Sequence, residues 1–392
     1  MAVPKLRFPE FTDEWKIYKL KEISSYNTKR VSISADNYIG TENLKKNYGG
    51  IDNPIQSDDL VNGVKFNFGN ILISNIRPYL KKIWYSNKFG CASSDVLVLN
   101  ANQGESKFLY YTLAQDKFFD YMMTGAKGSK MPRGDKKHIM DYYFRLPSLP
   151  EQKKIADFLS AFDKRIETTQ KKLAALEKLK KGFMQKIFSQ QLRFKDDNGN
   201  DYPAWEMKKF GDVMDDFSYG MNVASKRFDG RNKYIRITDI DESTHKYNSS
   251  DIVSPDGKLE QKYLVKDGDI LFARTGASVG KSYLYNSEDG NLYFAGFLIR
   301  GRVKSSYNPY FIYLQTLTFN YKKWVYVFSM RTGQPGINAE EYRSFKFLCP
   351  SLPEQKKIAD FLSAFDEKMN LVRKEVDTLQ TIKKGLLQQM FV

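Results

Sequence analysis

The feature that most constrains this chain is an exact internal repeat. The 17 residues PSLPEQKKIADFLSAFD occupy positions 147–163 and, letter for letter, positions 350–366, at an offset of 203. A weaker match precedes each copy: LRF at 6–8 corresponds to LRF at 192–194, at an offset of 186. The chain must therefore fold as two related halves, and the growing offset means that the second half carries insertions.

A heptad pattern runs through each copy of the repeat and beyond it. Apolar residues recur at alternating steps of four and three positions, which is the period of a coiled-coil seam. The predicted seam consists of Ile155, Leu159, Phe162, Ile166, Leu173 and Leu176 in the first copy and of Ile358, Leu362, Phe365, Met369, Val376 and Leu379 in the second. The sequence therefore predicts two long helices that pair antiparallel within one chain, each roughly 55 Å long at 1.5 Å per residue.

Both predicted helices begin with the same signal. Glu151 follows Ser148 by three positions, and Glu354 follows Ser351 in the same way, which is the S-x-x-E pattern of a capping box. In such a box the glutamate side chain reaches back to the backbone of the serine. The pattern therefore predicts a helix start at both places.

Lysine interrupts the seam once in each copy, at Lys180 and Lys383. One interpretation is a register device, because a charge in an apolar stripe penalises slipped pairings. The other is that Leu179 and Ile382 take over the stripe while the lysine heads reach outward to water. The second interpretation is favoured here, since lysine stems bury easily and their charged ends escape.

The segments ahead of the helices indicate mixed domains. Short β-like runs include VKFNF, NILIS, DVLVLN, KYIRITDI, DILFAR and NLYFAGFLIR, and helices are predicted at KFLYYTLAQDKFFDYMM and PYFIYLQTLTFNYKKWV. The predicted fold class is α+β: two mixed α/β domains linked by an antiparallel coiled coil, with an approximate internal two-fold axis. The predicted limits are 1–146 for the first domain, 147–190 for the first helix, 191–349 for the second domain and 350–392 for the second helix.

The composition favours a polyanionic partner. Lys and Arg number 62 against 46 Asp and Glu, for a net charge of +16, which usually indicates phosphate backbones, acidic membranes or acidic proteins. Aromatic residues make up 15 % of the chain and suit contacts with bases, so nucleic acid is the first candidate. Only Cys91 and Cys349 are present, which argues against a disulfide framework or a zinc site. No run approaches the roughly 18 apolar residues of a membrane span, and we expect a cytoplasmic protein without membrane contact.

Three motifs suggest catalysis but fit it poorly. GASVGKS at Gly276 is one residue shorter than a phosphate-binding P-loop, so a glycine-rich turn is the better interpretation. NPYF at 308–311 lacks the second proline of the N-P-P-[YF] motif of adenine methyltransferases and predicts a helix start with Asn308 as its cap. Asp256 and Glu260 lie too close together for the PD…ExK pattern of nucleases. We therefore predict a binding function, with no catalytic residue and no metal ligand.

Basic and polar loops occupy matched places in the two halves. The predicted DNA-binding residues are Arg77, Tyr79, Lys81, Lys82, Lys127, Ser129, Lys130 and Arg133 in the first half and Arg274, Thr275, Ser278, Lys281, Arg331, Thr332, Gln334 and Asn338 in the second. These residue types bind base edges and phosphates of duplex DNA. Corresponding loops with different side chains are what two readers of different sequences would carry, whereas solvated surface loops are the simpler alternative.

The repeat and the long helix after it resemble the specificity subunit of type I restriction-modification systems. The shared pattern is P-x-L-P-E-Q-[KR]-K-I-A-x-[FL]-L at the end of a domain, present twice, and the resemblance covers the entire chain. GDILFARTGASVGK and the GQPGIN loop are similar to sequences typical of the target-recognition domains of that family. The first domain departs from this wording, with GNILISNIRPYLKK and KMPRGD.

The resemblance implies a DNA-binding subunit that is not itself an enzyme. Each target-recognition domain would read one half of a split site in double-stranded DNA, and the coiled coil would set the spacer and dock two methyltransferase subunits. These partners would methylate adenine N6 with S-adenosylmethionine, and restriction subunits would use ATP and magnesium, so no cofactor is expected on this chain. Domains that address one face of B-DNA need centres roughly 34 Å apart, a distance that helices of this length can set.

Functions of two other classes stay open at this point. One is a lone nucleic-acid methyltransferase or nuclease, which would transfer methyl groups or cleave without partners. The other is a coiled-coil adaptor that never binds DNA, which would show no salt-dependent gel shift.

Overall fold

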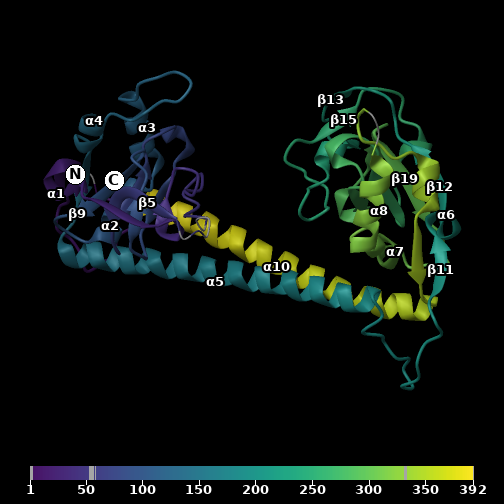
Figure 1. Ribbon diagram of the computed structural model, residues 1–392. Coiled ribbons are helices and arrows are strands. Elements are labelled where there is room, and N and C mark those ends of the chain that lie inside the picture. Colours follow the sequence, from purple (N-terminus) through teal and green to yellow (C-terminus); the bar gives the residue numbers. More distant parts are fainter. Residues whose placement is uncertain (1–2, 53–56, 58, 331–332, 392) are drawn as a thin grey trace. The chain divides into compact units, whose positions relative to one another are not determined.

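The computed structural model describes residues 3–52, 57, 59–330 and 333–391 (Figure 1). The chain divides into two units, of which unit 1 comprises residues 1–171 and 372–392 and unit 2 comprises residues 172–371. Two long helices, α5 (Leu149–Phe188) and α10 (Leu352–Met390), each contribute one part to either unit. Among the described residues, no helix combines the length and the apolar character that a membrane span requires.

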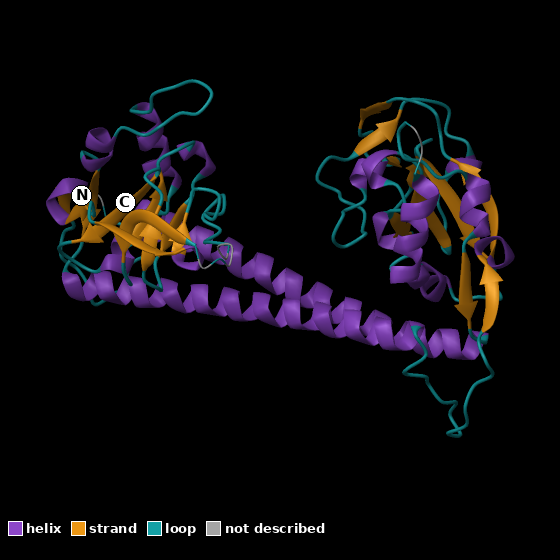
Figure 2. Cartoon of the chain, in the orientation of Figure 1, coloured by secondary structure: helices purple, strands orange, loops and turns teal. Residues whose placement is uncertain are grey.

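The globular part of unit 1 is built on two four-stranded sheets, with strand orders β2-β9-β6-β7 and β3-β5-β8-β4, and on the antiparallel pair β1-β10 (Figure 2). All four residues of β6 are buried, because its sheet packs between helices on one face and the second sheet on the other. The strands are β1 (Lys16–Lys19), β2 (Ser24–Tyr26), β3 (Arg30–Ser34), β4 (Tyr38–Ile39), β5 (Leu60–Phe66), β6 (Ile71–Ser74), β7 (Ile83–Tyr85), β8 (Gly90–Ala92), β9 (Val96–Ala101) and β10 (Tyr143–Leu146). The helices are α1 (Leu20–Ile23), α2 (Ser106–Leu113), α3 (Asp116–Thr124) and α4 (Lys136–Met140), with 3-10 turns η1 (Ala35–Asn37) and η2 (Pro78–Leu80).

Unit 2 repeats this plan with a different periphery. Its central sheet has the order β12-β19-β16-β17, and the pairs β11-β20, β13-β15 and β14-β18 complete it. The strands are β11 (Glu206–Lys209), β12 (Met214–Tyr219), β13 (Ser225–Arg227), β14 (Lys233–Ile235), β15 (Val253–Pro255), β16 (Asp269–Ala273), β17 (Ser282–Leu284), β18 (Leu292–Phe294), β19 (Leu298–Val303) and β20 (Lys346–Cys349). The helices are α6 (Phe210–Val213), α7 (Pro309–Gln315), α8 (Phe319–Ser329) and α9 (Ala339–Ser344), with 3-10 turns η3 (Ile237–Asp239), η4 (Gln261–Tyr263), η5 (Gly276–Ser278) and η6 (Ser287–Asp289).

The repeat therefore extends from the helices to the whole domains. The order β2-β9-β6-β7 matches β12-β19-β16-β17, the antiparallel pair β1-β10 matches β11-β20, and a parallel pair, β4-β8 or β14-β18, occurs in each unit. The predicted α+β fold with two mixed domains and two long helices is confirmed. Each long helix predicted inside a domain is in fact two shorter helices, because a new N-cap at Gln115 or Thr318 starts a second one.

The two long helices pack antiparallel within each unit. In unit 1, Arg165 of α5 lies 3.1 Å from Glu375 of α10, while Asp163 lies against Lys383. In unit 2, Phe183 packs against Phe361, with ring centroids 5.1 Å apart. Of the predicted seam residues, Ile155, Leu159, Ile166, Leu176, Ile358, Leu362, Met369, Val376 and Leu379 are buried, and Phe162, Leu173 and Phe365 are half-buried.

The structure overturns the preferred interpretation of the seam lysines. Lys180 is only 9 % exposed and Lys383 is half-buried, whereas Leu179 and Ile382 are 53 % and 44 % exposed. The lysines thus stay in the stripe and the neighbouring apolar residues face outward. The physical reason is that each ammonium group has a carboxylate partner on the opposite helix, so it does not need to reach water.

The helix starts that the S-x-x-E pattern marks are confirmed, but its two glutamates bind partners far along the chain. Helix α5 begins at Leu149, but the carboxylate of Glu151 accepts hydrogen bonds from Arg7 at 2.7 and 2.8 Å and from the indole of Trp15 at 3.3 Å. Glu354 has the same kind of partners in Arg193 and Trp205. A charged guanidinium group stabilises a buried carboxylate more than a local backbone amide does, so these glutamates anchor domains and do not cap helices.

Candidate DNA interface

The two predicted loops of each domain lie side by side. In unit 1 the backbone N–H of Arg77 donates to the carbonyl of Pro132 at 2.7 Å, and the backbones of Ile76 and Arg133 form an isolated antiparallel β-bridge. The loop after β6 is thereby joined to the loop between α3 and α4. Residues that are 50 or more positions apart in the sequence therefore form one surface.

Unit 2 contains the same junction at the corresponding positions. The N–H of Gly276 donates to the carbonyl of Pro335 at 2.9 Å, and the backbones of Thr275 and Gly336 form an isolated antiparallel β-bridge. Gly276 and Pro335 correspond to Arg77 and Pro132 at the offsets of 199 and 203 that the sequence gives for these segments. The two-loop surface is thus a shared element of both domains.

The turn after the central strand has one backbone shape and two sequences. In unit 2 Gly276 and Gly280 have φ angles of 69° and 81°, and in unit 1 the corresponding Arg77 and Lys81 have φ angles of 51° and 52°. A left-handed conformation is free for glycine but costs a residue with a Cβ roughly 1–2 kcal/mol. The GASVGKS segment is therefore a turn, as predicted, and the first domain keeps the turn in spite of the strain.

Several predicted residues of unit 1 present their side chains on this surface. Arg77, Tyr79, Lys127, Ser129, Lys130 and Arg133 are all exposed, with Tyr79 at 50 %. Lys127 and Arg133 also form ion pairs with Asp135 and Asp95, at 3.3 and 2.8 Å, and both cations remain largely accessible. This set combines cations, a hydroxyl and an aromatic ring, the types that contact phosphates and bases.

The predicted residues of unit 2 are less exposed. Gln334 is exposed, whereas Arg274, Thr275 and Ser278 are half-buried, and the guanidinium of Arg274 stacks 4.9 Å from the ring centroid of Tyr219. Arg331 and Thr332 lie outside the described residues. The second surface is therefore polar and partly held in place, and the amide side chains of Gln334 and Asn338 are among its exposed described positions.

Four other predicted residues have partners within the fold. Lys81 pairs with Asp116 at 2.6 Å, and Asn338 caps α9 by accepting from the N–H of Glu341 at 2.9 Å. The ammonium groups of Lys82 and Lys281 donate to the carbonyls of Thr41 and Ile240, at 2.6 and 3.2 Å. These two carbonyls are related by the same offset of 199 as the lysines. Desolvation, together with the charge of Lys46, lowers the pKa of Lys82.

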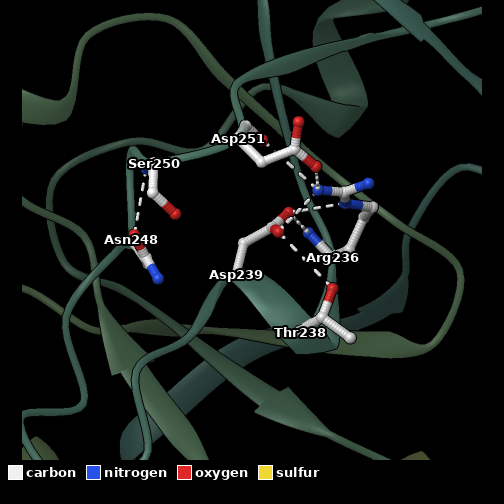
Figure 3. A network of polar contacts seen from close by, with 6 residues as sticks. All are labelled: Arg236, Thr238, Asp239, Asn248, Ser250 and Asp251. Carbon is white, nitrogen blue, oxygen red and sulfur yellow. Dashed lines mark hydrogen bonds and ion pairs between the residues drawn. The ribbon is translucent and has the colours of Figure 1, made fainter. Parts of the chain in front are cut away.

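A loop cluster in unit 2 is held together by Arg236 (Figure 3). Its guanidinium donates twice to the carboxylate of Asp239, at 2.8 Å each, and also to Asp251 at 3.1 Å. The hydrogen bond with Asp239 is the main reason that the pKa of Arg236 is raised. Ser250 donates its N–H to Asn248 at 3.0 Å in the same loop. This arginine therefore fixes a loop and is not available to an external anion.

Sequence reasoning missed the residues that hold each domain on its helix. Besides Glu151 and Glu354, the next residue of the repeat makes matched contacts. The amide of Gln152 accepts from the N–H of Glu105 at 2.9 Å and donates to the carbonyl of Pro147 at 2.8 Å. Gln355 does the same with Asn308 and Pro350, at 2.9 Å in both cases. Their signal was present in the sequence, because the EQ pair lies inside the identical segment and the LRF match precedes it.

The motifs that suggested catalysis have structural roles. Asn308 caps α7 by accepting from the N–H of Phe311 at 2.9 Å, as predicted. Asp256 and Glu260 lie in ion pairs with Lys226 and Lys262. Within the described ranges, no group of three or more His, Cys, Asp or Glu side chains is arranged to hold a metal ion.

The comparison with known families decides what this architecture is. Residues 12–178 and 203–381 each match the type I restriction modification DNA specificity domain. The chain belongs to this family of type I restriction-modification specificity subunits. The two matched stretches contain the two domains and most of both long helices, so the family assignment covers both halves of the repeat.

Individual relatives agree with the family assignment. The chain is 25 % identical over 405 residues to the type I restriction enzyme MjaVIII specificity subunit of Methanocaldococcus jannaschii, covering 97 % of this chain and 92 % of that one. It is 24 % identical over 258 residues to the StySPI specificity subunit of Salmonella potsdam, covering 62 % and 55 %.

Solved structures share the fold. The S subunit of a type I restriction-modification system from M. genitalium superposes with a TM-score of 0.65 at 17 % identity, over 100 % of this chain and 99 % of the other. A second solved chain comes from structural work on complex assembly and conformational transition of the type I restriction-modification system. It superposes with a TM-score of 0.54 at 18 % identity, over 96 % of this chain and 97 % of the other.

Proposed function

We propose that this specificity subunit recognises a two-part site in double-stranded DNA, one part per domain. The observation that carries the proposal is the matched two-loop surface: both domains join the same loops by the same backbone hydrogen bond but present different side chains. A fixed frame with variable side chains is what two readers of different base sequences require. The net charge of +16 supplies the attraction for phosphates.

In this proposal the long helices set the spacer and bind the partner subunits. Several identical residues of the repeat, among them Lys153 and Lys356, Asp157 and Asp360, and Ala161 and Ala364, are exposed in both copies. An identical exposed surface present twice suits two copies of one partner. We assign this role to two methyltransferase subunits, with restriction subunits joining for cleavage.

The chain itself is proposed to be non-catalytic and to bind no cofactor. Methylation of adenine N6 with S-adenosylmethionine, and any use of ATP and magnesium, belong to the partners. The motif assignments support this, because Asn308 of NPYF is occupied as a helix cap and the GASVGKS segment is a tight turn. Methyl transfer by the purified chain alone would overturn this part of the proposal.

Methylome sequencing tests the main proposal. The chain is expressed with its methyltransferase partner in a host without other adenine methylation, and modified adenines are mapped. We expect a two-part sequence with one fixed spacer. A continuous recognition sequence, or methylation that does not depend on this chain, would contradict the proposal.

A variant pair assigns the domains. Tyr79→Ala in the first surface and Gln334→Ala in the second remove one exposed side chain each. Each should relax base preference in one half of the site by about 1–3 kcal/mol and leave the other half unchanged. Ser250→Ala, outside both surfaces, serves as the matched control.

A further inference from the structure

A buried lysine in unit 2 joins three elements at one point. Lys180 of α5 lies 2.6 Å from the carboxylate of Asp366 on α10 and 3.2 Å from the phenol oxygen of Tyr310 on α7. The phenol of Tyr310 also donates to Asp366. Both helices and the first helix after the central sheet of the domain therefore meet at a single charged group.

Unit 1 contains the counterpart with the helices exchanged. Lys383 of α10 pairs with Asp163 of α5, and the phenol of Tyr111 on α2 donates to the same carboxylate at 2.6 Å. The ammonium group of Lys383 lies 5.4 Å from the ring centroid of Tyr111, as that of Lys180 lies 5.8 Å from the ring of Tyr310. We call these two clusters the Lys–Asp–Tyr clamps.

We propose that the clamps are positioning sites, in which one seam lysine fixes both the register of the helix pair and the seat of the adjacent recognition domain on it. The inference rests on the proposed function only where it concerns DNA, because the contacts lie within each unit. Lys180, Lys383, Asp163 and Asp366 are positioning residues for recognition, and Tyr111 and Tyr310 extend the clamp to the domains.

The tyrosines show that the contact was not merely copied. The aspartates and the lysines are both related by the offset of 203, but the tyrosines are separated by 199 positions. At that offset of 203, Leu314 stands where Tyr111 would be copied, and Lys107 stands where Tyr310 would be. The phenols therefore come from different turns of corresponding helices and reach the same carboxylate, which indicates that the three-way contact itself is required.

The lysine contact is selective for one register. Both Lys–Asp pairs belong to one antiparallel register of the helices, in which the numbers of facing residues add up to 546. A slip of one heptad would set Lys180 opposite Ala359 or Arg373 and would leave Asp366 opposite Leu173 or Ile187. An unpaired charge inside a seam is strongly unfavourable, so only the observed register satisfies both groups.

The phenols remain hydrogen-bond donors in this setting. Burial, and then the charge of the neighbouring aspartate, raise the pKa of both Tyr111 and Tyr310 well above that of a free tyrosine. A neutral phenol donating to a carboxylate that also holds a lysine is a charge-assisted contact. Movement of the domain on the helix pair would break it, whereas apolar packing alone would tolerate small shifts.

The first experiment measures the coupling without DNA. Tyr310→Phe removes a single oxygen and Lys180→Met removes the charge at similar volume; the two single variants and the double variant are unfolded in denaturant. Tyr310→Phe should lower the denaturant midpoint of unfolding. We expect this shift to be at least about threefold smaller in the Lys180→Met background, because the phenol of Tyr310 and the ammonium group of Lys180 share the carboxylate of Asp366. Arg165→Met, which removes the exposed ion pair with Glu375 at 67 % exposure of the arginine side chain, is the control and should shift the midpoint little.

The second experiment measures spacer discrimination. Methylation by the reconstituted complex is compared on DNA with the natural spacer and with spacers one base pair longer or shorter, well below the unfolding temperature. We expect Tyr310→Phe and the double variant Lys180→Met with Asp366→Leu to lower the preference for the natural spacer by about tenfold, the factor for one charged hydrogen bond. Arg165→Met should leave the preference unchanged.

The outcomes separate the two proposals. Additive midpoint shifts, or an unchanged spacer preference in the clamp variants, would overturn the positioning role. If the unmodified complex methylates no two-part site, the proposed function fails, and the midpoint coupling alone then decides on the clamps.

Discussion

The two DNA specificity domains share a backbone plan and differ in the charge that they bury at the start of the central strand. In unit 2, Asp269 at the start of β16 is fully buried and accepts two hydrogen bonds from Arg302, at 2.7 and 2.9 Å. At the corresponding place in unit 1, the amide of Asn70 donates to Asn100 at 2.7 Å. An ion pair in one domain is thus a neutral amide pair in the other.

The surroundings of the two pairs show why both solutions work. The carboxylate of Asp269 also accepts from the N–H of Lys266 at 2.8 Å, and the amide oxygen of Asn70 accepts from the N–H of Asn67 at 2.7 Å. Both residues therefore close the same turn before the central strand. The geometry of the turn requires an acceptor, while the charge depends on whether the neighbouring strand supplies an arginine.

The two domains thus keep the same hydrogen-bond geometry, and a position can hold different residues as long as each makes the same contact. The turn after β6 or β16 follows the same rule, with Arg77 and Lys81 in place of two glycines. A domain built in this way can change its surface side chains while its backbone frame stays the same.

The largest expected effect comes from replacing one member of the Asp269–Arg302 ion pair, which makes unit 2 resemble the Asn70–Asn100 amide pair of unit 1 at one of the two positions. Asp269→Asn should cost about 3 kcal/mol of unfolding free energy, because Arg302 loses its carboxylate partner and the 4 %-exposed side chain of Arg300, which also pairs with Asp216, loses a second carboxylate at 4.0 Å. Adding Arg302→Asn recreates the amide pair of unit 1 and should recover part of the loss. Equilibrium unfolding in denaturant measures both variants, and a double variant that is less stable than Asp269→Asn would contradict the equivalence.

The next effect concerns the domain anchors. Glu151→Gln and Glu354→Gln each remove the charge that holds an arginine and a tryptophan, at an expected cost of about 2 kcal/mol. The loss should be larger for Glu151, because the side chain of Arg7 is 13 % exposed and that of Arg193 is 27 %. Urea midpoints of the two variants provide the test, with Glu167→Gln in an exposed i,i+4 pair as the control.

A smaller effect is expected at the matched turns. Gly276→Ala should destabilise unit 2 by about 1–2 kcal/mol, because φ is 69° and the new Cβ would lie 3.0 Å from Nε2 of Gln334. Arg77→Gly at the corresponding position should change stability by less than about 1 kcal/mol, since relief of strain offsets the entropy of glycine. Thermal unfolding of both variants checks the contrast; equal losses would mean that the turns are not equivalent.

The smallest effect is a difference in salt dependence. Lys130→Ala removes an exposed lysine of the first surface and should weaken DNA binding similarly for all sequences, lowering the slope of log K against log salt by about 1. Lys82→Ala should leave that slope unchanged, because its ammonium group is bound to the carbonyl of Thr41. Gel-shift titrations at several salt concentrations would show the opposite order if Lys82 were the phosphate contact.

The sequence by itself determined the two helices, the two mixed domains and the family. A period of 3.5 residues and an identical segment are local or directly countable, and the neighbours of a helical residue at three and four positions follow from helix geometry. The cap at Asn308 and the turn at Gly276 were also predictable, since each depends on residues only a few positions away.

Only the tertiary structure decided which charged groups face each other. Glu151 finds Arg7 at a separation of 144 residues, Lys180 finds Asp366 at 186, and Lys82 finds the carbonyl of Thr41 at 41. The local patterns pointed elsewhere for two of these residues: Glu151 was part of a helix-start signal, and Lys180 was expected to reach outward to water. A buried charge is placed by whichever partner the fold brings within 3 Å, and that partner is not fixed by any spacing along the chain.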